Sequence, residues 1–174
     1  MPALALQSLW SVTAPPGPEC AALGAPVKAQ VAIIGAGYTG LAAALLLAEA
    51  GTEVVVLESR DVGDCASGLN GGQVIPGVKH DPDTLEALFG AKAGARLIGT
   101  VATAPEVVFA LIERLGIACD ATRTGWIQPA TSEAALQQQA QRVEQWRRRA
   151  APVELLSRAQ VAQLTGSGPL NMQA

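Results

Sequence analysis

The chain has 174 residues, 49% of them hydrophobic, and its 12 basic and 15 acidic side chains give a formal net charge of -3. This length and composition predict one ordinary globular domain and exclude collagen, coiled coil and bulk disorder. A sequence pI near 5.1 leaves no overall positive field of the kind that attracts nucleic acid or an acidic membrane surface. We therefore expect neither a nucleic-acid partner nor a membrane partner.

The N-terminal residues 1–26 are rich in proline and small side chains, which is typical of an extended arm. This stretch lacks the positive start and apolar centre of a signal peptide. Cys20, Cys65 and Cys119 are widely spaced and form no CxxC pair. That pattern predicts no metal site and no disulfide framework, and it favours the reducing cytoplasm as the location.

The stretch Ala29–Ala48 contains no charged residue and is about as long as a membrane span. Three glycines, however, divide it into a β-branched part and a Leu/Ala-rich part, and a membrane span needs no such division. A buried strand at Val31–Ile34, a helix at Leu41–Ala50 and a second strand at Val54–Leu57 explain the pattern better. Residues 27–79 are thus expected to form a β-α-β unit with a glycine-rich loop.

Residues 80–174 are expected to form a mainly helical segment that leads into a substrate domain not contained in this chain. Pro105 predicts a break or kink near Ala104, because proline cannot continue the helical hydrogen bonding. Ser157 and Gln160 have the spacing of a capping box at a helix start. The expected elements are helices at 82–89, 91–115, 132–149 and 157–164 and a strand at 126–128.

The segment Gly35–Gly40 reads GAGYTG and lies between the first predicted strand and the helix. In a GxGxxG motif the first glycine permits a tight turn, the second a close approach to a diphosphate, and the third close packing of helix on strand. The free N–H groups and positive dipole at the helix N-terminus then favour the phosphates. The motif predicts a dinucleotide-binding site.

Glu58 ends the second predicted strand, where an acidic side chain accepts hydrogen bonds from the adenosine ribose. An acid there also repels a 2′-phosphate, which disfavours NADP. The alternative is a glycine-rich turn in another α/β protein, with Glu58 as a solvated strand end. The motif by itself does not decide between NAD and FAD, but the loop Ala66–Gln73, which reads ASGLNGGQ, brings further backbone amides and favours FAD.

The strings GAGYTGLAAALLLAEAG, VVVLES and ASGLNGGQVIPG together resemble the N-terminal part of the FAD-dependent amine and amino-acid oxidoreductases of the D-amino-acid oxidase superfamily. Within that superfamily the chain is most similar to the gamma-glutamylputrescine oxidoreductase-like group. The segments SLWSVTAPPGP, GVKHDPDTL and TRTGWIQPA extend the resemblance along nearly the whole chain. It implies an α/β fold with a Rossmann-like FAD-binding β-α-β unit followed by helices, incomplete relative to the full family fold.

Carried over position by position, the resemblance implies that the diphosphate lies at the glycine motif, the ribose at Glu58 and the isoalloxazine side at the second loop. Leu69 departs from the pattern, since such loops often carry arginine at this position. Without the guanidinium, charge compensation near the phosphates or the flavin is weaker. The implied cofactor-binding residues are Gly35, Ala36, Gly37, Tyr38, Thr39, Gly40, Glu58, Ser59, Ser67, Gly68, Asn70, Gly71, Gly72 and Gln73.

The implied reaction is hydride transfer from an amine C–N bond to flavin, with formation of an imine. Enzymes of this family are considerably longer, so we expect a truncated N-terminal fragment whose small-molecule amine substrate is bound by the full-length relatives. The alternative is a dinucleotide-binding remnant without activity. The sequence assigns no catalytic residue, no particular amine and no oligomeric state.

Overall fold

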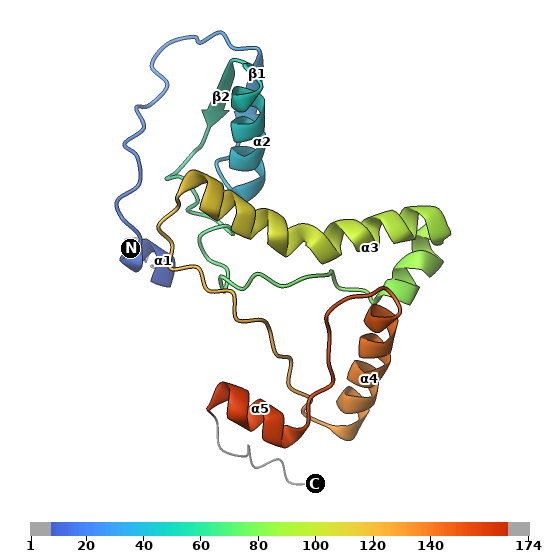
Figure 1. The fold of residues 1–174 in the computed structure, drawn as a ribbon. Helices are drawn as coiled ribbons and strands as arrows, with labels where there is room; N and C mark the ends of the chain where they lie inside the picture. The colour runs from blue at the N-terminus through green and yellow to red at the C-terminus, as the bar shows by residue number, and fades with distance from the viewer. Residues whose placement is uncertain (1–7, 167–174) are drawn as a thin grey trace, which may run out of the picture. The chain divides into compact units, whose positions relative to one another are not determined.

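The computed structural model describes residues 8–166 (Figure 1). Its elements in chain order are α1 (Leu9–Thr13), β1 (Val31–Ile34), α2 (Tyr38–Glu49), β2 (Val54–Leu57), α3 (Pro82–Leu115), α4 (Glu133–Arg147) and α5 (Arg158–Thr165). The chain divides into two compact units, Met1–Gln73 and Val74–Ala174. The first unit contains the sheet and the second is helical.

The sheet of the first unit is a parallel pair of strands connected by a helix. β1 and β2 pair with Val31 opposite Val54, and α2 packs against both strands. The predicted β-α-β unit and both of its strands are confirmed. The helix begins at Tyr38 rather than at the predicted Leu41, because Gly37 has extended backbone angles and serves as the N-cap.

The strands of this unit are less buried than the sequence predicts. Along β1 half-buried and exposed residues alternate, and Ile34 is 90% exposed. A two-stranded sheet has open edges and cannot bury both of its faces with one helix. The prediction of a buried strand is therefore wrong for β1 as to its burial. The buried apolar side chains among the described residues are those of Ala36, Pro82, Leu85, Ile98 and Val143.

The N-terminal arm is not extended throughout. Residues 9–13 form the short helix α1, which corrects the prediction of an extended arm at that point. Ser8 and Ser11 make a reciprocal capping box: the Ser8 hydroxyl accepts from Ser11 N at 3.1 Å, and the Ser11 hydroxyl accepts from Ser8 N at 3.0 Å. These local bonds start the helix where composition alone indicates an irregular chain.

The long helix α3 is interrupted at Gly90, whose φ of 76° and ψ of 159° are not helical. This confirms the predicted boundary between two helical parts. Of the break or kink predicted near Ala104, the break is wrong, because the helix continues through Pro105. Proline provides no N–H for the carbonyl of Val101, and Gly77 N donates to that oxygen instead at 3.1 Å. The preceding loop thus satisfies the group that the proline leaves without a helical partner.

The helices α4 and α5 begin as the sequence predicts. The hydroxyl of Ser132 caps α4 by accepting from Ala135 N at 3.1 Å. Ser157 and Gln160 form the predicted capping box of α5, which ends one residue beyond the predicted Leu164. Both helix starts are therefore local properties of the sequence.

The predicted strand at Trp126–Gln128 is wrong. These residues have irregular backbone, and the Trp126 side chain is 46% exposed. The side chain of Gln128 instead accepts a hydrogen bond from Arg142 Nη1 at 3.1 Å. A strand requires a neighbour to pair with, and in the described part of the second unit no strand edge is present.

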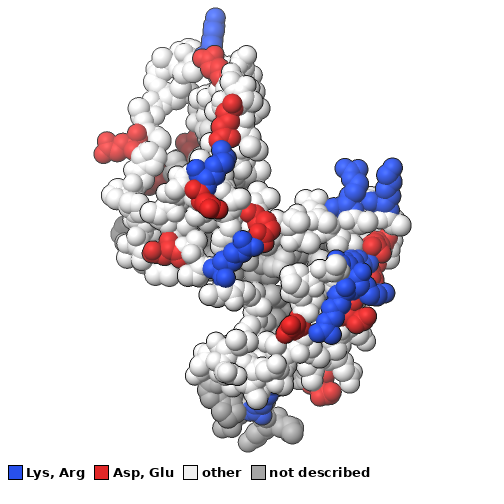
Figure 2. Space-filling model, viewed as in Figure 1, with Lys and Arg blue, Asp and Glu red and all other residues white. Residues whose placement is uncertain are grey.

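Ion pairs join the end of α4 to the first turn of α3. Arg142 Nε lies 2.6 Å from an Asp81 oxygen, and Asp83 receives Arg148 at 2.7 Å and Arg149 at 2.9 Å. Burial raises the pKa of Asp83, but hydrogen bonds and charge from Arg149 and Arg148 outweigh it, so that the pKa is below its usual value. These arginines are thus paired with carboxylates at the start of α3, and Figure 2 shows acidic and basic side chains intermixed on the surface.

The uncharged stretch Ala29–Ala48 is divided between β1 and α2 and forms no continuous helix. Among residues 8–166, α3 is long and apolar enough to cross a membrane by length and composition. A core helix of a soluble protein passes the same test. The expectation of no membrane partner therefore stays a prediction.

Candidate functional site

The glycine motif has the backbone geometry that its sequence predicts. Gly35 has a φ of +101°, in the region that favours glycine, and its N–H donates to Leu57 O at 2.8 Å. A Cβ added at Gly40 would overlap the carbonyl oxygen of Gly35 and lie 3.3 Å from Ile33 Cγ2. The start of α2 is therefore packed directly against the turn that leaves β1.

The amino end of α2 receives a neutral contact from the second loop. Gly37 is its N-cap and has no side chain to cap the first turn. The hydroxyl of Ser67 approaches from the second loop and accepts from Tyr38 N at 3.0 Å. It lies 2.8 Å from where a Cβ of Gly37 would be, so a larger residue at position 37 would displace this hydroxyl. Because the hydroxyl is neutral, the helix dipole keeps its positive end, and these residues fit a diphosphate.

Glu58 links the end of β2 to the glycine motif. Its Oε2 accepts from Ala36 N at 2.7 Å, and its Oε1 accepts from Ser59 N at 2.8 Å and Arg60 N at 3.1 Å. The hydrogen bond from Ala36, followed by that from Arg60, lowers the pKa of this carboxyl below its ordinary value. Oε1 already accepts at least two hydrogen bonds, whereas Oε2 accepts one and has a further lone pair for a ribose hydroxyl. The ribose contact stays a prediction.

The lowered pKa makes the stability of the fold depend on pH through Glu58. The carboxylate stabilises the folded chain fully above the ordinary pKa of 4.5, and this contribution is lost as the pH falls through the lower folded value. We expect Glu58→Gln to lower the urea midpoint of unfolding near neutral pH. The difference in urea midpoint between Glu58→Gln and the wild type should shrink as the pH falls below the ordinary pKa of 4.5. A difference that is constant across the acid range would contradict the role of the charge.

Asn70 shapes the second loop with all of its side-chain polar atoms. Its Nδ2 donates to Ser67 O at 2.6 Å and to the Tyr38 hydroxyl at 3.2 Å, and its Oδ1 accepts from Gly72 N at 2.8 Å. Gly72 has a φ of +67°, which this turn requires. The side chain thus fixes the loop and connects it to α2. A direct contact of Asn70 with a flavin stays a prediction.

The predicted site residues form one connected cluster at the carboxyl ends of β1 and β2. Gly63 N donates to Ala36 O at 3.0 Å and Gly68 N donates to Cys65 O at 2.9 Å, which folds the start of the second loop against the motif. The residues joined directly by side-chain hydrogen bonds in this cluster are Ala36, Tyr38, Glu58, Ser59, Ser67, Asn70 and Gly72. Thr39, Gly71 and Gln73 are exposed in the same segments.

The sequence-based set of site residues omits Trp10. Its indole Nε1 donates to Asn70 O at 2.7 Å, although the two residues are far apart in the chain. A tryptophan within a proline-rich arm is the signal that could have drawn attention to it, because a large aromatic side chain in such a segment usually packs on something.

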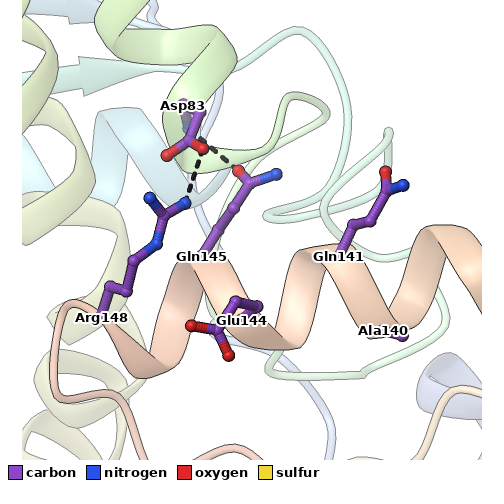
Figure 3. A pocket seen from close by; sticks show the side chains of 6 residues that line it. All are labelled: Asp83, Ala140, Gln141, Glu144, Gln145 and Arg148. Atoms are coloured by element: carbon purple, nitrogen blue, oxygen red, sulfur yellow. Dashed lines mark hydrogen bonds and ion pairs between the residues drawn. The ribbon is translucent and has the colours of Figure 1, made fainter.

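A hollow of about 460 Å³ lies in the second unit beside α4 (Figure 3). In it the carboxylate of Asp83 and the guanidinium of Arg148 neutralise each other, and Gln145 Oε1 accepts from Asp83 N at 3.0 Å. Asp83 and Arg148 therefore pair with each other across this hollow, and they do not mark a ligand site. Within residues 8–166 no group of three or more His, Cys, Asp or Glu side chains could hold a metal ion.

Several characterised or named proteins are similar to this chain. Gamma-glutamylputrescine oxidoreductase of Escherichia coli K12 is 38% identical over 123 residues, which cover 70% of this chain and 28% of that protein. The probable oxidoreductase OrdL of Rhizobium meliloti is 38% identical over 110 residues, covering 63% of this chain and 26% of that protein. The probable oxidoreductase OrdL of Haemophilus influenzae is 40% identical over 92 residues, which cover 53% of this chain and 21% of that protein. The chain thus spans about a quarter of their length.

No solved structure matches the chain significantly. The FAD dependent oxidoreductase family, DAO, matches residues 30–172, which include β1, the glycine motif, Glu58 and the second loop. The match therefore extends over both compact units and over the whole cluster at the ends of β1 and β2. On this match the chain belongs to the DAO family of FAD-dependent oxidoreductases.

Proposed function

We propose that the chain binds FAD at the amino end of α2 and is the FAD-binding part of an oxidoreductase that acts on amine or amino-acid C–N bonds. The observation that carries the proposal is the start of α2, where Gly37 provides no side-chain cap and a neutral hydroxyl, that of Ser67, accepts from Tyr38 N. The family is FAD-dependent, and one relative is named as acting on gamma-glutamylputrescine. A small-molecule amine is accordingly the proposed substrate class.

Each part of the cluster has a proposed role. The backbone of Gly35, Gly37 and Gly40 lies along the diphosphate, and Glu58 accepts from the ribose hydroxyls. Ser67 keeps its hydroxyl hydrogen for a phosphate oxygen, because it accepts rather than donates in its bond with Tyr38. The loop 70–73 lies on the isoalloxazine side. When bound, FAD supplies the acceptor for the hydride that leaves the substrate carbon.

The cytoplasm is the proposed location. The three thiols Cys20, Cys65 and Cys119 are free and exposed, and thiols of this kind persist in a reducing compartment.

The proposal is tested by incubating the purified chain with FAD, separating it by gel filtration and recording its absorption spectrum. We expect a flavin band that elutes with the protein. Riboflavin, which lacks the diphosphate and the adenosine, is the matched control ligand and should not be retained. A colourless protein fraction after incubation with FAD would overturn the proposal.

A second measurement distinguishes an enzyme from a binding remnant. Addition of amines under anaerobic conditions to the FAD-loaded chain should bleach the flavin band if the chain itself oxidises C–N bonds. A retained band that no amine bleaches assigns the chain to cofactor binding without activity.

A further inference from the structure

Trp10 joins the N-terminal arm to the second loop through two separate contacts. The indole Nε1 donates to Asn70 O at 2.7 Å. The six-membered part of the ring lies against Gly72, where a Cβ would be only 2.5 Å from Trp10 Cζ2. A hydrogen bond and a ring contact thus hold the same turn of the loop, and glycine at position 72 leaves room for the ring in this place.

The helix that presents Trp10 cannot be stable by itself. α1 has five residues and none of them is buried, whereas isolated helices shorter than about 12 residues are marginal in water. The capping box of Ser8 and Ser11 contributes locally, but the long-range contact that anchors α1 is that of Trp10. The contacts of Trp10 therefore stabilise both α1 and the loop at residues 70–72 in the conformations seen here.

The loop that Trp10 touches is connected directly to the candidate cofactor site. Asn70 donates to the Tyr38 hydroxyl and to Ser67 O, and Ser67 accepts from Tyr38 N at the start of α2. Hydrogen bonds therefore connect Trp10 in the arm through Asn70 to the amino end of α2. All of these residues belong to the first compact unit.

We propose that Trp10 is a positioning residue and that α1 acts as a clasp: its indole holds the loop 67–72 against the amino end of α2 and thereby slows the release of FAD. The part that concerns FAD rests on the proposed function. The clasp itself is a property of the chain without a ligand, so that the two can be tested separately.

The clasp is tested by hydrogen–deuterium exchange of the chain without FAD, comparing the wild type, Trp10→Ala and Trp10→Phe. Trp10→Ala removes both contacts and should speed exchange of the amides in peptides covering 67–73 by about tenfold. Trp10→Phe keeps a ring on Gly72 but has no N–H, and it should give an intermediate rate. Exchange in α2 and β2, which belong to the same compact unit, should stay at the wild-type rate, which shows that this unit of each variant is folded.

The matched control is Trp126→Ala, which removes a tryptophan that is 46% exposed and belongs to the other unit. It should leave exchange in 67–73 unchanged. If Trp10→Ala behaves like this control, the clasp is overturned whether or not FAD binds.

The cofactor part is tested by the rate of FAD release, measured as the return of flavin fluorescence on dilution. We expect release about tenfold faster from Trp10→Ala than from wild type, with Trp10→Phe between them and Trp126→Ala unchanged. Faster exchange in 67–73 with unchanged FAD release would overturn this part alone. A wild-type chain that retains no FAD would refute the proposed function, while the exchange experiment still decides the clasp.

Discussion

Ser67→Asp is expected to lower the affinity for FAD by about tenfold or more without destabilising the fold. The carboxylate would replace a neutral hydroxyl that accepts from Tyr38 N at the start of α2. A negative charge there interacts favourably with the helix dipole, by about 0.3–1 kcal/mol. The same charge would stand where the diphosphate of FAD is proposed to bind, and charges about 4 Å apart repel by roughly 4 kcal/mol near a protein surface.

Ser67→Asp is expected to lower FAD affinity while it leaves stability unchanged or slightly raised. General destabilisation of the fold would lower both, so the two measurements together identify the effect of the charge. FAD affinity is measured by titration of flavin fluorescence, and stability by the midpoint of thermal unfolding in the absence of FAD. Ser67→Asn is the matched control, because it is nearly the size of aspartate and can accept the same bond without a charge. It should bind FAD within about threefold of the wild type, the effect of less than one hydrogen bond. If Ser67→Asp binds FAD as well as Ser67→Asn does, the diphosphate does not lie at this end of α2.

The parts of the fold that the sequence predicts correctly are those with local causes. The strands at Val31–Ile34 and Val54–Leu57 are short β-branched runs between glycines and polar residues. The capping box of α5 and the break at Gly90 depend on residues a few positions apart. The glycine motif likewise contains the cause of its own turn, since Gly35 needs the positive φ that the structure shows.

The parts that the sequence does not predict depend on residues far apart in the chain. Arg142 and Asp81 are oppositely charged and 61 positions apart, and nothing local indicates that they pair. Helix continuation through Pro105 depends on Gly77 N, which occupies the orphaned carbonyl of Val101. In the candidate site the same holds for Trp10, whose partner Asn70 is 60 positions away. Long-range pairing of this kind is set by packing, which a single sequence does not display.

Gly40→Ala is expected to unfold or strongly loosen the first compact unit. A Cβ at position 40 would overlap the backbone carbonyl oxygen of Gly35 and press on Ile33 Cγ2 at 3.3 Å. A backbone atom cannot turn aside as a flexible side chain does, so α2 must move away from the turn after β1. Overpacking of this kind costs typically 1–3 kcal/mol, about 3 kcal/mol at a backbone contact, and it outweighs the helix propensity of roughly 1 kcal/mol that alanine gains over glycine.

Gly99→Ala is the control that isolates the steric effect. Gly99 lies within α3, and nothing stands within 4 Å of where its Cβ would be. The same substitution should therefore stabilise the chain by up to about 1 kcal/mol, because it adds helix propensity and no contact. Urea unfolding followed by circular dichroism measures both variants, and titration with FAD measures whether the site survives. The changes in urea midpoint of the two variants need not be equal in size. A Gly40→Ala chain as stable as Gly99→Ala would show that the motif does not need its third glycine for packing. In that case the constraint at position 40 would have to come from the cofactor rather than from the contact between α2 and the turn after β1.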